Sequence, residues 1–188
     1  MKIISDKHIN ILRPHAITIG KFDGLHLGHM ALIKKTIDYA ERLNIPSMVF
    51  TFHPSPISVL TGIPFEPLLS EEQKIGILAE MGIDILINYP FDRSFANIPP
   101  KAFMTLLFEG LGCRALTIGE GLRFGKNRQG ECSALVEAGK KYGAIVEIVK
   151  IIKLDGEPIS SSRIRQAIAD NNIPLAERLL GRPIYAPA

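Results

Sequence analysis

The residues of this 188-residue chain best suited to chemistry lie in one stretch, IGKFDGLHLGHMALIKK, residues 19–35. His26 and His29 stand three positions apart, with Gly28 directly before the second and Gly24 just upstream. A short apolar run typical of a buried strand precedes them, and apolar residues at helical spacing follow them. The pattern predicts a strand that turns into a helix, with both imidazoles at the helix N-terminus.

A helix N-terminus binds anions because its first backbone N–H groups lack partners and the helix dipole is positive there. Two histidines three residues apart share one side of the helix and can donate hydrogen bonds to developing charge. We expect Gly24 and Gly28 to let the backbone approach the anion, since neither has a Cβ. The stretch therefore predicts a phosphate site. The alternative to a binding site is a pair of ordinary surface histidines beside a glycine turn.

A second stretch whose residues could take part in chemistry is ISSSRIRQAI, residues 159–168. Three serines at the start of a helix are ordinary caps by themselves. Arg163 and Arg165 add planar guanidinium groups that stay charged at any working pH and bind phosphate well. The serines and arginines together predict a binding site for a polyphosphate.

Three other kinds of site are not supported. GEGLRFGK, residues 119–126, follows a strand, but its glycine spacing fits neither a dinucleotide-binding fingerprint nor a P-loop. A zinc site made by His26, His29 and His53 lacks a fourth obvious ligand and a familiar spacing. The sequence therefore favours neither a dehydrogenase, a P-loop ATPase nor a zinc enzyme.

Short apolar runs alternate along the chain with helical patterns. We expect strands at 15–20, 47–52, 83–87, 113–118 and 144–152, and helices at 28–43, 71–81, 99–109, 133–142, 160–169 and 174–180. The expected caps include a box of Ser70 with Gln73, Ser133 at the start of its helix, and a stop at Asn44. This alternation predicts an α/β, Rossmann-like three-layer fold of one domain, residues 1–188, with a mainly parallel sheet of about five strands. Ligands then bind at the carboxyl ends of the strands.

The composition limits the class of partner. With 46% hydrophobic and 22% charged residues and a net charge of +3, the chain is typical of a globular protein whose basic residues are scattered, so we expect no nucleic-acid partner. Its apolar runs are shorter than the ~18 residues of a membrane helix, so we expect no membrane association. Two cysteines, Cys113 and Cys132, suit a reducing compartment, and we expect the cytoplasm. The oligomeric state stays open.

Six strings together resemble one branch of the nucleotidylyltransferase superfamily: GKFDGLHLGHMALI, FTFHPSP, EEQKIGILAEMGID, RFGKNRQG, ISSSRIR and LLGRP. The chain is similar from about residue 15 to residue 185 to the adenylyltransferase domain of the bacterial FAD synthetase family. The resemblance implies the nucleotidylyltransferase type of fold and an FMN adenylyltransferase, which converts FMN and ATP into FAD and pyrophosphate. It also implies ATP and FMN as partners and Mg²⁺, supplied with ATP, as cofactor.

The resemblance assigns roles to residues of this chain. The implied catalytic residues are His26, His29, Ser162 and Arg165. The implied ATP-binding residues are Gly20, Phe22, Asp23, Gly24, His26, Gly28, His29, Ser161, Ser162 and Arg165, with Asp23 ordering its loop or the magnesium shell. The implied flavin-binding residues are His53, Pro54, Pro56, Gly119, Gly121, Phe124 and Gly125.

The chain departs from the family pattern on the flavin side. Family members usually carry Asp or Asn followed by Phe where this chain has Gly121 and Leu122, so we expect one hydrogen bond to FMN to be lost. The string His53 to Ile57 also differs from the acidic-Pro-His-Pro-Arg pattern. In the common bacterial enzyme, LLGRP leads into a riboflavin kinase domain; this sequence ends at Ala188, so we expect no kinase activity. The alternatives are another small-molecule nucleotidyltransferase and a nucleotide-binding regulatory relative with a weakened flavin site.

Overall fold

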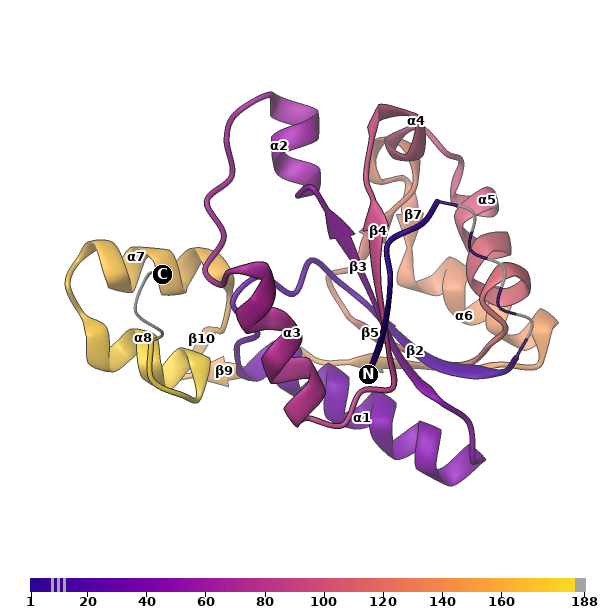
Figure 1. The fold of residues 1–188 in the computed structure, drawn as a ribbon, viewed down its shortest axis with the longest axis horizontal. Coiled ribbons are helices and arrows are strands. Elements are labelled where there is room, and N and C mark those ends of the chain that lie inside the picture. The colour runs from indigo at the N-terminus through magenta and orange to yellow at the C-terminus, as the bar shows by residue number, and fades with distance from the viewer. Residues whose placement is uncertain (8, 10, 12, 185–188) are drawn as a thin grey trace.

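A twisted parallel sheet forms the centre of the computed structural model, which describes residues 1–7, 9, 11 and 13–184 (Figure 1). Within these residues the strand order is β1(Lys2–Ile4), β4(Ile85–Pro90), β3(Ser47–His53), β2(His15–Ile19), β5(Cys113–Gly119) and β8(Ile145–Val149). Every neighbouring pair is parallel. The predicted Rossmann-like class is confirmed, and the sheet has six strands.

The sixth strand corrects the expectation of about five. β1 spans three residues, none of them fully buried, so it lacks the continuous apolar run that marks the inner strands. It pairs with β4 at the sheet edge. Two small antiparallel pairs were also not predicted: β6(Arg123–Phe124) with β7(Gly130–Glu131), and β9(Lys153–Leu154) with β10(Glu157–Pro158). The predicted strand 144–152 is shorter than expected, since β8 ends at Val149.

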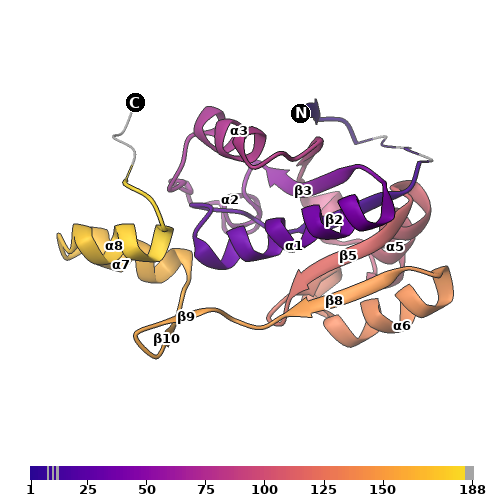
Figure 2. The same ribbon diagram turned by 90° about the horizontal axis from the view of Figure 1, so that it is seen from below.

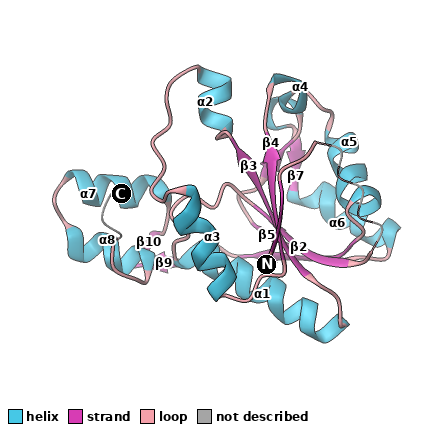
Figure 3. Cartoon of the chain, viewed as in Figure 1, coloured by secondary structure: helices cyan, strands magenta, loops and turns pink. Residues whose placement is uncertain are grey.

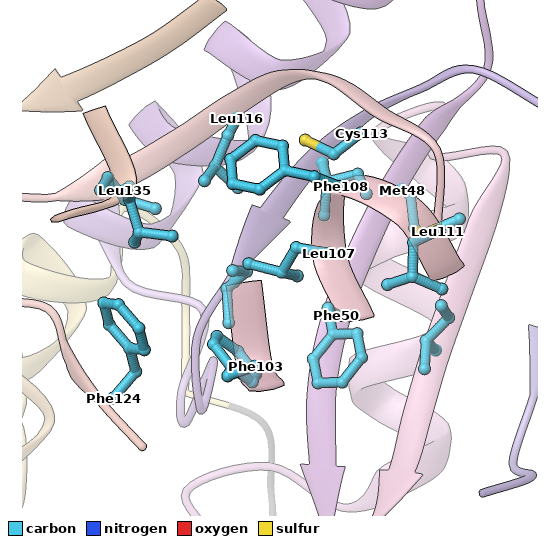
Figure 4. Packing of buried hydrophobic residues seen from close by; sticks show 14 of the residues in the cluster. Met48, Phe50, Phe103, Leu107, Phe108, Leu111, Cys113, Leu116, Phe124 and Leu135 are labelled. Carbon is cyan, nitrogen blue, oxygen red and sulfur yellow. The ribbon is translucent and has the colours of Figure 1, made fainter. Parts of the chain in front are cut away.

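Helices cover both faces of the sheet, which makes three layers (Figure 3). One face packs against α1(Leu27–Leu43) and α3(Glu71–Glu80), through a cluster that includes Ile33, Val49 and Leu78. The other face packs against α5(Pro100–Thr105), a π-helical segment Leu106–Gly110 and α6(Cys132–Tyr142). Figure 4 shows this larger cluster, with aromatic and aliphatic side chains of helices and strands interleaved.

Small side chains let α1 lie close over the middle of the sheet. Ala16 pairs with Ala115 and Thr18 with Thr117 in adjacent strands, and all four are buried. Ala16 and Ala115 pack against Ala40 of α1. Because α1 runs back over β2, its N-terminus lies at the carboxyl end of the central strand.

The helix ends test the predicted caps. Ser70 and Gln73 form the capping box of α3, and Asn44 ends α1 in the left-handed conformation, both as predicted. Ser133 is not a cap, because α6 begins one residue earlier and Glu131 is its N-cap residue. The predicted helix 99–109 divides into two parts: α5 ends at Thr105, and the π-helical segment continues it from Leu106 to Gly110.

Four further α-helices lie among the described residues. The short helices α2(Pro56–Thr61) and α4(Arg93–Ala96) were not predicted, and they lie beyond the carboxyl ends of β3 and β4 (Figure 1). α7(Ser161–Ala169) and α8(Ile173–Leu180) form a hairpin beside the sheet (Figure 2). Its apolar residues, Ile164 and Leu179 among them, make a separate cluster that contacts Leu27 and Leu68. The described helices include none long and apolar enough to cross a membrane.

Candidate active site

The loop from Gly20 to His26 connects the central strand β2 to α1. β2 lies between β3 and β5. The strands that follow β2 first continue on one side of it, with β3 and β4, and then on its other side, with β5 and β8, so the strand order reverses at β2. In open parallel sheets the crevice at such a reversal, outside the carboxyl ends of the strands, is where ligands bind. The predicted phosphate motif therefore lies at the position that the topology favours.

Burial holds this loop in a strained shape. Phe22 and Leu25 have positive φ angles of 48° and 42°, which side chains with a Cβ rarely adopt. Both side chains are fully buried in the cluster beneath α1 and α3. Packing of two large apolar residues offsets the backbone strain and fixes the direction in which the neighbouring polar residues point.

His26 is the N-cap residue of α1. Its Nδ1 atom accepts a hydrogen bond of 3.3 Å from the backbone N–H of His29. The ring is buried, with 6% of the residue exposed, and this burial is the main reason why the pKa of His26 falls to about 4. At neutral pH the imidazole is uncharged, and since Nδ1 accepts, the proton is on Nε2. His26 can therefore donate one hydrogen bond from Nε2, but it brings no positive charge.

His29 stacks on His26, with ring centroids 3.7 Å apart and an angle of 15° between the planes. Phe22 contacts its ring edge-on at 5.2 Å. Burial, followed by the proximity of His26 and of Lys74, holds the pKa of His29 well below its usual value. Its Nδ1 atom is buried and has no hydrogen-bond partner among the described residues. A buried imidazole nitrogen without a partner is costly unless a ligand completes it.

The N-terminus of α7 is attached to the histidine loop. The Arg165 guanidinium donates to Asp23 Oδ2 at 2.7 Å, and the Ser161 hydroxyl donates to the Asp23 carbonyl at 2.8 Å. Asp23 is buried, and its other carboxylate oxygen accepts from the Leu68 N–H at 2.9 Å. Both carboxylate oxygens of Asp23 have a donor within the protein, which supports the expected role of Asp23 in ordering the loop; its role in a magnesium shell stays a prediction.

Arg165 also contacts the segment that follows α2. It donates to the carbonyl of Glu66 and lies over the Phe65 ring, 5.0 Å from its centroid. Ser160 caps α7, and Arg163 donates to three carbonyls around the β9–β10 turn, so both have structural contacts. Ser162 is exposed at the first turn of α7. Arg165 thus joins α7, the histidine loop and residues 65–66.

The glycines of the loop are needed for packing within the protein. A Cβ on Gly28 would lie 3.1 Å from the His26 ring, and one on Gly20 would lie 3.1 Å from the Phe22 ring. Gly24 has a φ of +82°, and a Cβ there would meet Leu68 at 2.8 Å. Both Gly24 and Gly28 therefore have a packing role within the protein, and their expected role in the approach of an anion stays a prediction.

A small polar cavity of about 240 Å³ lies at the ends of β3 and β4. His53, Pro54 and Pro56 of the predicted flavin-binding set line it, together with Asp23. Lys74 of α3 also lines it, and burial is the main cause of the lowered pKa of its ammonium group. This cavity adjoins the histidine loop, so a phosphate held there would meet Lys74, a residue to which the sequence analysis gave no role.

A larger cavity of about 660 Å³ lies beside the carboxyl ends of β2 and β3. Five phenylalanines line it: Phe52, Phe91, Phe95, Phe103 and Phe124. Its other walls include Ile57 and Leu60 of α2. Of the predicted flavin-binding residues, Pro56, Phe124 and Gly125 line this cavity, whereas Gly119 and Gly121 line neither cavity.

Among the described residues that line the larger cavity, every charged one is a cation. They are Lys21, Arg93, Arg123 and Arg128, and the described lining includes no carboxylate. Arg123 forms an ion pair with Glu131, outside the cavity lining. Aromatic walls with unbalanced positive charge suit a large aromatic anion. The sequence reasoning assigned no role to Lys21, Arg128 or four of the five phenylalanines, because no pattern along the chain shows that these separate segments line one cavity.

The chain matches known proteins over most of its length. A family model described as FAD synthetase matches residues 8–163. The bifunctional riboflavin kinase/FMN adenylyltransferase of Escherichia coli K12 is 36% identical over 188 residues, which cover 97% of this chain and 60% of that protein. The protein of the same name from Haemophilus influenzae is 38% identical over 176 residues, covering 92% of this chain and 57% of the relative. The chain thus spans about 60% of the length of these relatives.

Two solved structures are similar to this one. A Streptococcus pneumoniae protein described as a macrolide-efflux protein superposes with a TM-score of 0.84 at 27% identity, covering 98% of this chain and 61% of that one. The pantothenate synthetase of Thermus thermophilus has a TM-score of 0.51 at 17% identity, covering 96% of this chain and 81% of that one, which shows the fold alone. On the family match and the identity to curated relatives, the chain belongs to the FAD synthetase family.

Proposed function

We propose that the protein transfers AMP from ATP to FMN, which gives FAD and pyrophosphate. The observation that carries this proposal is the position of the aromatic, cationic cavity directly beside the histidine loop, with Gly20 and Lys21 shared between them. Flavin rings are large, flat and aromatic, and FMN adds a phosphate that is mostly dianionic at neutral pH. The family and the names of the relatives support the same reaction.

In this reaction an oxygen of the FMN phosphate attacks the α-phosphorus of ATP. A new bond forms between that oxygen and the α-phosphorus, the bond to the β-phosphate oxygen breaks, and pyrophosphate leaves with the electron pair. The attacking phosphate is already ionised, so no general base is required. The protein's task is to position the two phosphates and to stabilise charge in the transition state.

His26 and His29 contribute as uncharged hydrogen-bond donors. The lowered pKa values of both rings keep them neutral before ATP binds. A neutral donor fixed by burial and stacking needs little reorganisation during the reaction. We assign the His26 and His29 rings to the ATP phosphates, and Ser162 with Arg165 to the departing pyrophosphate.

Positive charge would come from other groups. Lys74 lies near both His29 and Asp23, close enough to change their electrostatic environment. Mg²⁺ prefers several oxygen ligands, and the described residues contain no group of three or more His, Cys, Asp or Glu placed to hold a metal ion. The chain therefore fits Mg²⁺ as an ion carried on the ATP phosphates, where it supplies charge neutralisation.

We further propose that the reaction takes place in the cytoplasm. Cys113 and Cys132 are both free thiols in the structure, as a reducing compartment would keep them. Cys113 is buried, which raises the pKa of its thiol to about 12 and makes it unreactive.

The direct test is incubation of the purified protein with FMN, ATP and Mg²⁺, followed by separation of FAD from FMN. We expect FAD and pyrophosphate in equal amounts, no product with EDTA, and recovery when Mg²⁺ is added back. Riboflavin, pantetheine phosphate and nicotinamide mononucleotide serve as competing acceptors in parallel reactions. Adenylylation of another acceptor in preference to FMN would identify a different nucleotidyltransferase, and nucleotide binding without turnover would identify a regulatory relative.

A further inference from the structure

Lys21 belongs to the GKFDGLHLGHMALI string, but the family resemblance assigned it no role; it lies at the boundary between the two cavities. It directly follows Gly20 at the carboxyl end of the central strand, and it lines both the small polar cavity and the large aromatic one. Its backbone carbonyl accepts a hydrogen bond of 3.1 Å from the Thr51 hydroxyl, which ties the residue to β3. The backbone of Lys21 is therefore tied to β3 at a point where the residue borders both cavities.

The Lys21 ammonium group has a second cation as its neighbour. Burial, followed by the positive charge of Arg128, lowers the pKa of Lys21, and Asp23 acts in the opposite direction more weakly. Asp23 already has the Arg165 guanidinium as its ion-pair partner. Among the described residues, the side chains of Lys21 and Arg128 have no hydrogen bond or ion pair of their own. Two neighbouring cations without a carboxylate between them favour an anion.

The backbone also places Arg128 for this role. Asn127 and Arg128 are consecutive residues with positive φ angles of 53° and 58°, in the turn that follows Gly125. This turn is held by hydrogen bonds from Lys126 N–H to the Ile98 carbonyl and from Arg128 N–H to the Gly125 carbonyl. Asn127 and Arg128 of this turn line the large cavity, whereas Lys126 does not.

We propose that Lys21 and Arg128 form the subsite for the terminal phosphate of the flavin nucleotide, and that Lys21 positions this phosphate for attack. The proposal rests on the proposed function, since it names the part of the acceptor that these residues recognise. A dianionic acceptor that approaches a triphosphate is repelled by it, and a cation placed between them reduces that repulsion. Lys21 is the cation that lines both cavities, so it is placed to act on both phosphate groups.

The test compares two flavins that differ only in the phosphate. Binding of FMN and of riboflavin is measured by quenching of flavin fluorescence, for the wild type and for Lys21→Met, Arg128→Met and Lys21→Arg. Lys126→Met is the matched control, because Lys126 is exposed in the same turn but does not line the cavity. Steady-state FAD formation then gives the Michaelis constants for FMN and for ATP separately.

We expect Lys21→Met to weaken FMN binding about tenfold and to leave riboflavin binding unchanged, because only FMN carries the charge that the ammonium group recognises. Arg128→Met acts in the same direction, Lys21→Arg restores most of the affinity, and Lys126→Met behaves as wild type. The Michaelis constant for ATP stays within about twofold of the wild-type value.

Three results would overturn the subsite. Equal losses for FMN and riboflavin in Lys21→Met would show a structural role, and no loss for either would show no role. A loss confined to ATP would assign Lys21 to the other substrate. If the wild-type protein binds neither flavin, the proposed function fails as well, whereas FMN binding that is insensitive to Lys21 and Arg128 overturns the subsite alone.

Discussion

The histidine loop and the segment from Pro54 to Leu68 border the same small cavity, but they are built differently. In the loop, Phe22 and Leu25 are completely buried, and the Asp23 carboxylate has hydrogen-bond donors on both oxygens. In the other segment, α2 buries none of its residues, and Ile57, Leu60 and Ile63 are 38%, 56% and 66% exposed.

This difference separates two kinds of binding surface. The loop is rigid before any ligand binds, as the stabilisation of a transition state requires. The exposed apolar residues of α2 gain contacts only when a ligand fills the cavity beside them. Substitutions in the loop should therefore reduce turnover and, where an ion pair is broken, stability, whereas substitutions in α2 should alter the Michaelis constant of the flavin.

The largest effect is expected for Arg165→Ala. The change leaves the buried Asp23 carboxylate without its ion-pair partner and detaches residues 65–66 from α7. We expect FAD formation to fall by about 10²–10³-fold. Thermal unfolding should show a loss of about 1–3 kcal/mol, because Arg165 is partly exposed while Asp23 is not.

The matched control for Arg165 is Arg178→Ala. Arg178 donates to Asp155 at 2.8 Å, and both side chains are more than half exposed. We expect a change in stability of less than about 1 kcal/mol and normal turnover. An Arg165→Ala protein as stable and as active as the Arg178→Ala protein would contradict the joining role of Arg165.

His29→Ala should reduce turnover by about 10²–10³-fold with little change in stability, since alanine suits the first turn of a helix and the ring lacks a partner for Nδ1. Thermal unfolding and FAD formation are measured on the same preparation. Wild-type turnover in this variant would remove His29 from the phosphate site.

The pH dependence of stability tests the burial of His26. Its pKa is about 4 in the folded protein and ~6.5 in the unfolded chain, so the unfolded state takes up the proton first as the pH falls. The contribution of His26 to stability is complete above pH ~6.5, and up to about 3 kcal/mol is lost as the pH falls to ~4. His26→Asn keeps a good N-cap residue and should flatten this decline.

Urea unfolding of both proteins at pH 7.5, 6, 5 and 4 measures the decline. His15 and His29 also have lowered pKa values, so some of the decline should persist in the His26→Asn protein. Parallel curves for the two proteins would show that the His26 ring is solvated.

A smaller effect, confined to the flavin, is expected for Leu60→Ser. Leu60 lines the larger cavity and is 56% exposed without a ligand, so its loss removes apolar contact only in the complex. We expect about a fivefold rise in the Michaelis constant for FMN, with stability and the ATP constant unchanged. Ile63→Ser is the control, because Ile63 is also an exposed aliphatic residue but does not line the cavity; equal effects in both variants would contradict this assignment.

The smallest effect is expected for Gly121→Asn. The family resemblance alone implies that a restored side chain would improve FMN binding several-fold. In the structure Gly121 lines neither cavity, and a Cβ there would meet nothing within 4 Å. We therefore expect less than a twofold change in the Michaelis constant for FMN. A several-fold decrease would instead support the interpretation from sequence, that Gly121 lacks a side chain that binds FMN.

The predictions from sequence succeeded where the signal was local. The capping box at Ser70, the stop at Asn44 and the helix that begins beside His26 depend on residues a few positions apart. They failed where the signal was spread along the chain. β1 is held by pairing with a strand more than 80 residues away. The N-cap residue of α6 is Glu131, two residues before Ser133, because β7 continues directly into α6.

By itself the sequence determined the alternation of strands and helices and the placement of two histidines at a helix N-terminus, because hydrophobic periodicity and capping act over a few residues. Only the tertiary structure decided that Arg165 binds Asp23 across 142 positions, that five phenylalanines from separate segments line one cavity, and that Lys21 faces two cavities. The physical reason is that a cavity and an ion pair depend on distances in space, which are fixed only when the sheet brings remote segments together.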